Sequence, residues 1–203
     1  MYLPVSVASL LLYLYPVLVM VAEILVLHRR VRMAQVWALL LTLAGTLLAS
    51  GILSGLGRVS GIGVIFGLAS AVCYALFNLV GEAAVQRISP LASMSFAQWF
   101  SSLGLIVYLG PNVVKLPWQD AKSWVIGLAL ATIASILPFY LVLAGIKIIG
   151  AGRAAIISTF ELPMTFVLAA VFLTEIPQWN QWAGGLLVLI GVTILNWRTG
   201  YDG

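Results

Sequence analysis

Apolar runs long enough to cross a lipid bilayer occupy most of this chain, and they constrain its fold more than any single motif. A transmembrane helix needs about 20 mostly apolar residues, and seven such runs follow one another here with short polar stretches between them. The runs cover approximately residues 2–27, 34–53, 61–81, 91–109, 123–146, 154–173 and 182–196. They are continuous, whereas the strands of a membrane barrel alternate apolar and polar residues. The sequence therefore predicts an all-α membrane protein with about seven transmembrane helices.

The composition excludes the main alternatives. Of the 203 residues, 63% are hydrophobic and 8% are charged, whereas soluble domains are about a quarter charged and disordered chains have low hydrophobicity. The single cysteine, Cys73, excludes an internal disulfide and a multi-cysteine metal site, and we expect it to be a small buried core residue. The single histidine, His28, adjoins a basic cluster at a helix end. We therefore expect no catalytic residues, no metal site, no cofactor and no enzyme activity.

The basic residues predict how the chain is oriented in the membrane. The net charge is +4, but the basic side chains lie in short loops, where they indicate topology rather than a nucleic-acid partner. One side of the membrane would carry Arg29, Arg30, Arg32, Arg87, Lys147, Arg153 and Arg198, and the other Arg58, Lys115 and Lys122. Because basic loops stay in the cytoplasm, we expect a multi-pass protein of the cell (inner or plasma) membrane with a cytoplasmic C-terminus.

The first two apolar runs resemble the last two. When Pro16 is placed on Pro163, three further pairs match, and after a slip of one residue two more pairs match. These pairs are Ala8 with Ala155, Tyr13 with Phe160, His28 with Glu175, Gln35 with Gln181, and Gly45 with Gly191. The predicted orientations of the two copies are opposite, and inverted repeats are typical of transporters that open to either side in turn.

Two stretches at the end of the chain carry a family resemblance. The first, STFELPMTFVLAAVFLTE, runs from Ser158 to Glu175, and the second, WAGGLLVLIGVTIL, runs from Trp182 to Leu195. A looser match, LYPVLVMVAEILVLHRR, runs from Leu14 to Arg30. With a glutamate close to a proline, a closing glutamate and a glycine-marked last helix, the chain resembles EamA-type members of the drug/metabolite transporter superfamily. The matching positions are Glu161, Pro163, Glu175, Gly184 and Gly191.

The resemblance implies an architecture and an activity. Members of this family are similar to ten helices arranged as two inverted five-helix repeats. On that pattern residues 1–55 would be the last two helices of a first repeat, and residues 61–198 a complete second repeat. The chain would then lack the first three helices, as a fragment, a mis-started reading frame or a shortened paralogue that dimerises. The implied activity is alternating-access efflux or exchange of small metabolites or amino acids, often driven by proton gradients.

Glu161 is the strongest candidate for a functional residue. A carboxylate near the middle of a span costs about 2.5–3.5 kcal/mol on insertion scales, so it needs a partner, a polar cavity or a proton. Pro163 removes a backbone donor and frees a carbonyl group, and Ser158 and Thr159 lie next to that group in the sequence. Glu161 is therefore expected to couple protons or contact substrate, the alternative being a structural glutamate bonded to a neighbouring helix.

Two further constellations could border a substrate or proton pathway. Tyr74, Asn78 and Glu82 are spaced by four and share one helix face, which would line an aqueous pathway or form a hydrogen-bonded helix seam. Thr132, Ser135 and Pro138 are spaced by three and would also share a face. Kinked helices often border transporter sites, and prolines lie within three of the spans. These prolines are Pro16, Pro138 and Pro163, and weaker candidates are Gln98 and Trp99.

Another class of function also fits the helix count. A seven-helix membrane receptor or a non-transporting scaffold would have the same number of spans, but neither accounts for the repeat. An inactive fragment is a third reading. The partners expected are the lipid bilayer, a small-molecule substrate and a second copy of the chain in a homodimer.

Overall fold

The computed structural model describes residues 5–50, 60–110, 120–172 and 178–197. These residues form helices and their connections, with no strand among them, which confirms the predicted all-α class. Five helical runs are long and apolar enough to cross a membrane: Val7–Leu25, Gly61–Val85, Pro90–Leu109, Ala121–Ile149 and Ala151–Phe172. Two shorter or more polar helices, α3 (Met33–Ala49) and α10 (Trp179–Trp197), complete seven helical runs in the described part of the chain. Four residues used in the sequence analysis, Arg58, Lys115, Glu175 and Arg198, lie outside these ranges.

The chain divides into two compact units. Unit 1 holds the described residues up to Leu79 and those from Ala151 onward, and unit 2 spans Val80–Gly150. Helix α4 (Gly61–Val85) belongs to unit 1 as far as Leu79 and to unit 2 in its last turns.

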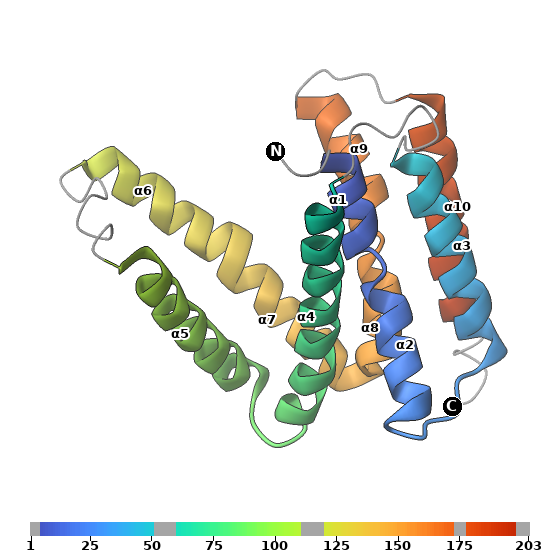
Figure 1. Cartoon of the computed structure of the whole chain (residues 1–203), viewed down its shortest axis with the longest axis horizontal. Helices are drawn as coiled ribbons and strands as arrows, with labels where there is room; N and C mark the ends of the chain where they lie inside the picture. The colour runs from blue at the N-terminus through green and yellow to red at the C-terminus, as the bar shows by residue number, and fades with distance from the viewer. Residues whose placement is uncertain (1–4, 51–59, 111–119, 173–177, 198–203) are drawn as a thin grey trace. The chain divides into compact units, whose positions relative to one another are not determined.

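Unit 1 contains two broken helices. The first consists of α1 (Val5–Leu12) and α2 (Tyr15–Leu25), and the second of α8 (Ala151–Ser158) and α9 (Glu161–Phe172) (Figure 1). Each break comprises two residues in a turn and is followed within the next three residues by a proline. A proline cannot donate a backbone hydrogen bond but fits the first turn of a helix, where those bonds have no intrahelical partner. A new helix therefore begins after each break, with Pro16 in the first turn of α2 and Pro163 in the first turn of α9, as the sequence predicts.

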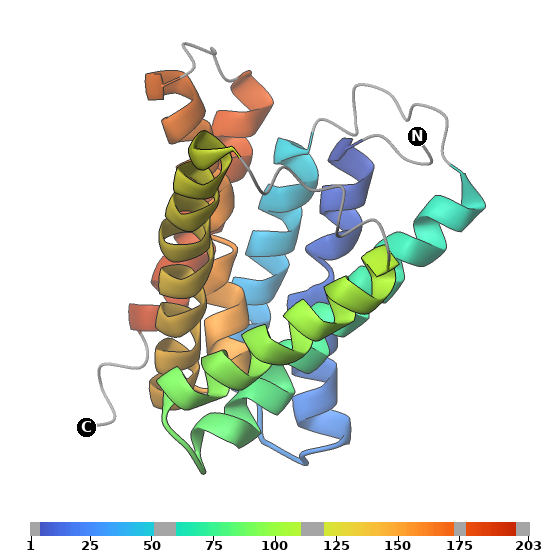
Figure 2. The same cartoon turned by 90° about the vertical axis from the view of Figure 1, so that its left-hand side faces the viewer.

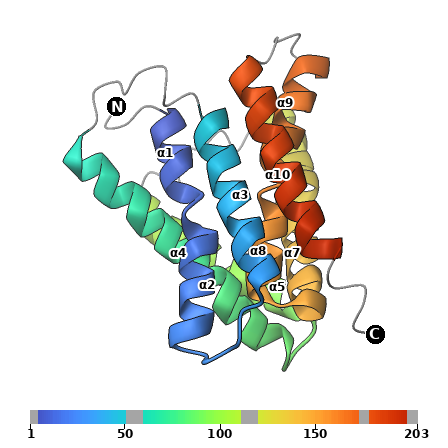
Figure 3. The same ribbon diagram turned by 90° about the vertical axis from the view of Figure 1, so that its right-hand side faces the viewer.

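Helices α3 and α10 pack side by side and run antiparallel (Figure 3). Their backbones approach closely where Gly45 faces Gly184 and where Gly191 faces Ala38. A Cβ atom on Gly184 would overlap the carbonyl oxygen of Gly45, and one on Gly191 would lie 2.9 Å from the carbonyl oxygen of Ala38. Small residues at a helix contact in a membrane permit this approach.

The paired elements of unit 1 keep a constant spacing along the chain. The end of α1 and the starts of α2 and α3 each precede the matching end or start of α8, α9 and α10 by the same number of residues. The N-terminal contacts repeat as well, because Gln35 accepts from the backbone of Arg32 at 2.9 Å and Gln181 accepts from that of Gln178 at 2.7 Å. The constant spacing pairs Tyr15, rather than Leu14, with Glu161. Placing Pro16 on Pro163 is therefore wrong by one residue, because a helix accepts proline at any position of its first turn.

Glu23 joins the ends of two helices in unit 1. Its side chain is buried and accepts from the backbone N–H of Gly152 at 3.2 Å and from Arg29 at 3.4 Å. The first N–H groups of a helix have no intrahelical partner, and a carboxylate there also interacts favourably with the helix dipole. Glu23 thus caps α8 from the end of α2 and also pairs with Arg29.

Unit 2 contains α5 (Pro90–Leu109) and one long helix composed of α6 (Ala121–Ala129), η3 (Leu130–Ile136) and α7 (Leu137–Ile149) (Figure 2). Asp120 caps α6, and the Ser123 hydroxyl and the backbone N–H groups of Lys122 and Ser123 hold the pKa of its carboxyl below the usual range. Segment η3 is a π-helix one turn before Pro138, so the helix widens there rather than breaking. The expected shared face of Thr132, Ser135 and Pro138 is therefore wrong, because a spacing of three places residues on one face of an α-helix or a 3₁₀-helix but not of a π-helix.

The outward surface of the described residues is apolar, as in a protein whose solvent is lipid. Side chains such as Trp99, Val107 and Tyr108 of α5 are more than two thirds exposed. Cys73 is also exposed, which corrects the expectation that it is a core residue. Helix α4 buries Ala71, Ala75 and Asn78 along one stripe, and Cys73 lies on another face.

The close approach of α3 and α10 predicts how unit 1 responds to one added methyl group. Gly184→Ala should lower the thermal midpoint of the purified protein by several degrees, because overpacking costs about 1–3 kcal/mol. Gly104→Ala in α5 is the matched control, since a Cβ atom there meets nothing within 4 Å. Size-exclusion chromatography after heating measures both variants. Equal thermal midpoints for Gly184→Ala and Gly104→Ala would contradict the close contact between α3 and α10.

Candidate functional site

Glu161 lies at the break of the second broken helix. It is the first residue of α9, directly after the two-residue turn formed by Thr159 and Phe160. Its side chain is exposed, and its backbone carbonyl accepts from Thr165 one turn later at 2.8 Å. The start of a helix favours a negative charge, so the break offers Glu161 a position where an ionised carboxylate is tolerated.

Three tyrosines interact electrostatically with this carboxylate. The hydroxyls of Tyr13 and Tyr15, at the break of the first broken helix, and of Tyr74 on α4 all lie within Coulomb range of Glu161. The Tyr15 and Tyr74 rings meet edge to face with centroids 4.5 Å apart, and Tyr74 stacks on Phe77 at 5.9 Å. The two breaks and α4 thus bring one acid and three phenols together, and we call these four residues the Glu161 cluster.

Buried hydrogen bonds fix the position of the cluster. The Tyr15 hydroxyl donates to the carbonyl oxygen of Ala155 at 3.1 Å, across the contact between α2 and α8, and interacts with the Ser158 side chain. The Asn78 amide is buried and donates to the carbonyl of Tyr74 at 2.8 Å. The Thr159 hydroxyl is buried and donates to the carbonyl of Ile156 at 2.6 Å. These polar groups hold the helix backbones and the tyrosine rings in place around Glu161.

The two prolines pack differently. Pro16 is fully buried, whereas Pro163 is half-buried and lies next to Gly185 of α10, where an added Cβ atom would be 3.3 Å from the ring.

Seven of the eight pathway residues predicted from sequence lie in unit 1. The eighth, Pro138, lies in unit 2.

The charge environment of Glu161 indicates what the cluster can do. Glu23 pairs with Arg29, whereas Glu161 has no basic side chain within 4.0 Å among the residues that the structure describes. Phenol hydroxyls can donate to a carboxylate, and their rings attract cations. The structure thus places an acid without a basic partner near phenol groups at a helix break.

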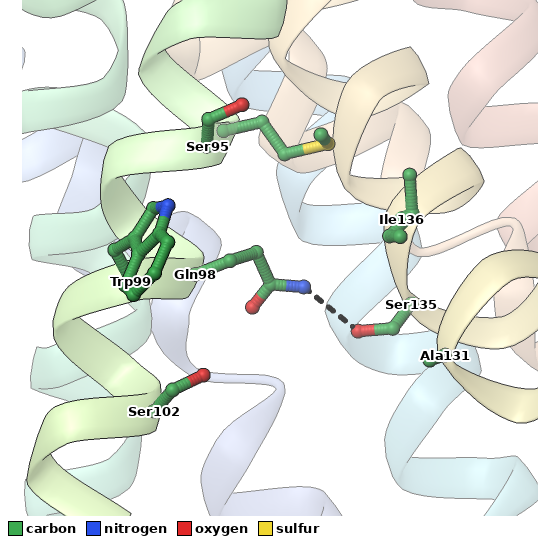
Figure 4. A pocket seen from close by; sticks show the side chains of 8 residues that line it. Ser95, Gln98, Trp99, Ser102, Ala131, Ser135 and Ile136 are labelled. Atoms are coloured by element: carbon green, nitrogen blue, oxygen red, sulfur yellow. Dashed lines mark hydrogen bonds between the residues drawn. The ribbon is translucent and has the colours of Figure 1, made fainter. Parts of the chain in front are cut away.

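Unit 2 holds a second polar feature. A groove of about 550 Å³ lies between α5 and η3 and is lined by Met94, Ser95, Gln98, Trp99, Ser102, Ala131, Ser135 and Ile136 (Figure 4). The Gln98 amide donates to the Ser135 hydroxyl at 3.0 Å. Sequence reasoning ranked Gln98 and Trp99 low and did not consider Ser95 or Ser102, although their spacing along α5 places them on one side of the helix.

Two tyrosines of the cluster, Tyr13 and Tyr15, were also missed as site residues. The repeat contained the missing signal, because the constant spacing of the two copies places Tyr15 at the position equivalent to Glu161. A residue that begins the second half of one broken helix is expected to face its equivalent in an inverted copy.

Comparisons with known proteins identify relatives over almost the whole chain. The sequence profile of the EamA-like transporter family matches residues 1–51 and 61–197. An uncharacterized transporter of Archaeoglobus fulgidus is 28% identical over 194 residues, which cover 96% of this chain and 67% of the relative. An uncharacterized transporter of Synechocystis is 29% identical over 202 residues, which cover 97% of this chain and 60% of the relative. The chain thus spans about two thirds of the length of these relatives.

A solved crystal structure has the same fold. It superposes with a TM-score of 0.80 at 20% identity, covering 99% of this chain and 71% of the other. This likeness concerns the arrangement of the helices alone.

The bond from Tyr15 to Ala155 gives a test of the site geometry. Tyr15→Phe keeps the ring against Tyr74 but leaves the Ala155 carbonyl without its donor. We expect a loss of about 0.5–1.5 kcal/mol in unfolding free energy, the usual contribution of one hydrogen bond. Tyr140→Phe, at an exposed site on α7, should change nothing measurable. Denaturant titration in detergent compares them, and equal stability of the two variants would refute a structural role for the bond.

Proposed function

The chain belongs to the EamA-like transporter family, and on this basis we propose that it moves small metabolites or amino acids across the membrane by alternating access, with Glu161 as the proton- or substrate-binding group. It is a multi-pass membrane protein of a transporter family rather than an enzyme. The observation that carries the proposal is the carboxylate of Glu161 at a helix break, which lacks a basic partner in the described part of the chain and interacts electrostatically with three tyrosines.

The free-energy cost of placing a carboxylate inside a membrane span supports a functional role for Glu161. An acid inside a membrane span is expensive unless it is paired, solvated or protonated. The Tyr15 hydroxyl already donates to Ala155, so in this proposal the hydroxyls of Tyr13 and Tyr74 partly compensate an ionised Glu161. A proton or a cationic substrate group compensates the charge fully. The site can therefore alternate between an empty charged state and an occupied neutral state, and this change in charge would be coupled to movement of the helices.

The two breaks supply places where such movement can occur. A break lacks part of the continuous backbone hydrogen bonding of a helix, so α1 can turn relative to α2, and α8 relative to α9, without opening a regular helix. Pro16 and Pro163 lie at the start of α2 and α9 and keep these breaks from closing. Ser158 and Thr159 lie on the α8 side of one break, where they would help define the site.

The orientation of the chain is part of the proposal. We propose that residues 1–55 and 61–198 derive from two inverted repeats, with the C-terminus in the cytoplasm. The antiparallel contacts of α2 with α8 and of α3 with α10 support this arrangement, as does the constant spacing of the paired helices. We also propose that two copies associate as a homodimer, which chemical crosslinking in native membranes measures directly.

Replacing the carboxylate tests the role of Glu161. In proteoliposomes with an imposed pH gradient, the wild-type protein should give electrical currents on addition of one or more compounds from a panel of amino acids and related metabolites. Glu161→Gln should lower this current at least about tenfold, as expected when a group that must bind a proton or cation loses its charge.

Two controls accompany this measurement. Asp120→Asn, at the exposed start of α6, removes a carboxylate outside the site and should leave the current intact. The size-exclusion profile of Glu161→Gln should match that of the wild type. A correctly folded Glu161→Gln protein with wild-type current would refute the proposal, as would a wild-type protein that is silent across the panel.

Thiol labelling tests the orientation. In a Cys73→Ser background, which has no other cysteine, a membrane-impermeant maleimide added outside intact cells should label Gln178→Cys but not Arg30→Cys. Permeabilised cells should give labelling at both positions. Labelling of both positions from the outside of intact cells would contradict the inverted arrangement.

A further inference from the structure

The groove between α5 and η3 is chemically distinct from the Glu161 cluster. It lies in unit 2, about midway along two membrane-spanning helices, and none of its lining residues is charged. Its volume of about 550 Å³ lies within the range of ordinary small-molecule sites, about 300–1,000 Å³. The proposed transport mechanism makes no use of it.

The π-helix positions one wall of the groove. Pro138, in the first turn of α7, cannot donate a backbone hydrogen bond. Immediately before Pro138 the backbone forms π-helical hydrogen bonds, in which an N–H group donates to the carbonyl five residues earlier. Leu137, for example, donates to the carbonyl of Thr132. One additional residue per turn rotates the side chains relative to an α-helix. Ser135 thereby accepts from Gln98 of α5 at 3.0 Å. π-Helical turns occur frequently at functional sites.

Several polar groups of the groove have no protein partner in the described residues. The Ser95 hydroxyl donates to the carbonyl of Leu91 at 2.9 Å and is satisfied. The Gln98 carbonyl oxygen, the Ser102 hydroxyl and the Trp99 indole N–H make no such bond. Figure 4 shows the oxygens of Gln98 and Ser102 directed into the space between the two helices. At this depth a lipid chain cannot satisfy them, and each unsatisfied group in hydrocarbon is costly.

We propose that this groove binds a small uncharged molecule with hydrogen-bonding groups. The Gln98 oxygen accepts from it, the Ser102 hydroxyl and the Trp99 indole N–H donate to it, and Met94 and the Trp99 ring contact its apolar part. A charged molecule is excluded, since a charge here would have no opposite charge and would be desolvated. The ligand class thus differs from that of the Glu161 cluster, which favours a proton or a cation.

The unique cysteine makes the proposal testable by reaction rates. In the Cys73→Ser background, Ser102→Cys places a thiol in the groove, and Ser101→Cys places one at the same depth on the adjacent face of α5. Both proteins are reconstituted into lipid vesicles and treated with three methanethiosulfonate reagents, which carry a neutral hydroxyethyl, a cationic trimethylammonium or an anionic sulfonate group. Each rate is divided by the rate of the same reagent with a free thiol in water.

The expected result has two parts. The neutral reagent should modify Ser102→Cys about tenfold faster than Ser101→Cys, and about tenfold faster than either charged reagent modifies Ser102→Cys, because a charge is disfavoured at this depth. Its rate should also saturate as its concentration rises, since a bound complex precedes the reaction. Gln98→Leu should abolish the saturation, and Gln98→Glu should shift the preference to the cationic reagent.

Three outcomes would overturn the proposal. Equal rates at positions 101 and 102 would mean that the groove is not a site. A rate that rises linearly with the neutral reagent would mean that the groove holds water without binding solute. A faster reaction with a charged reagent would mean that the ligand class is wrong. Glu161→Gln should leave the neutral reaction unchanged, so this test does not depend on the transport proposal.

Discussion

In a lipid bilayer each backbone N–H and C=O group must find its hydrogen bond within the protein, and the rest of this structure depends on that constraint. An unbroken helix satisfies it without help from side chains. Two runs nevertheless break between α1 and α2 and between α8 and α9, and both breaks lie in unit 1. The protein compensates at these places with side-chain bonds, such as that from Thr159 to Ile156 and that from Tyr15 to Ala155. Polar residues therefore collect where the helices stop, and the acid and phenols of the Glu161 cluster are among them.

The two broken helices are equivalent in backbone but not in chemistry. The starts of α2 and α9 have the same spacing as those of α3 and α10, and the contact of Gly45 with Gly184 has its counterpart in that of Gly191 with Ala38. At the first residue after the break, however, one copy has Tyr15 and the other has Glu161. Identical residues at both positions would place two acids or two phenols together. The difference gives one ionisable group that neighbouring hydroxyls can stabilise.

The helices were predictable from sequence because hydropathy and proline act locally. The expected spans agree with the described helices to within a few residues, and Pro16 and Pro163 marked both breaks. The face that each residue presents was less predictable, because it depends on the neighbouring helices. Cys73 was expected in the core but lies on the exposed face of α4, and Ser135 reaches Gln98 only because η3 is π-helical. Tyr13 and Tyr15 have nothing in their local sequence that identifies them as neighbours of Glu161.

Glu23 and Glu161 differ in their surroundings, and the difference distinguishes a structural glutamate from the one that we propose to be functional. Glu23 is buried, pairs with Arg29 and caps α8 through Gly152. Its charge is therefore compensated within the protein, and an added proton would weaken those bonds. Glu161 is exposed, interacts electrostatically with three phenols and has no basic side chain within 4.0 Å among the described residues. A transporter needs a group whose occupied and empty states differ little in free energy, because a site that is too well satisfied in either state would not cycle. Of these two acids, the proposed binding role therefore fits Glu161, which has no basic partner in the described part of the chain, rather than Glu23, which pairs with Arg29.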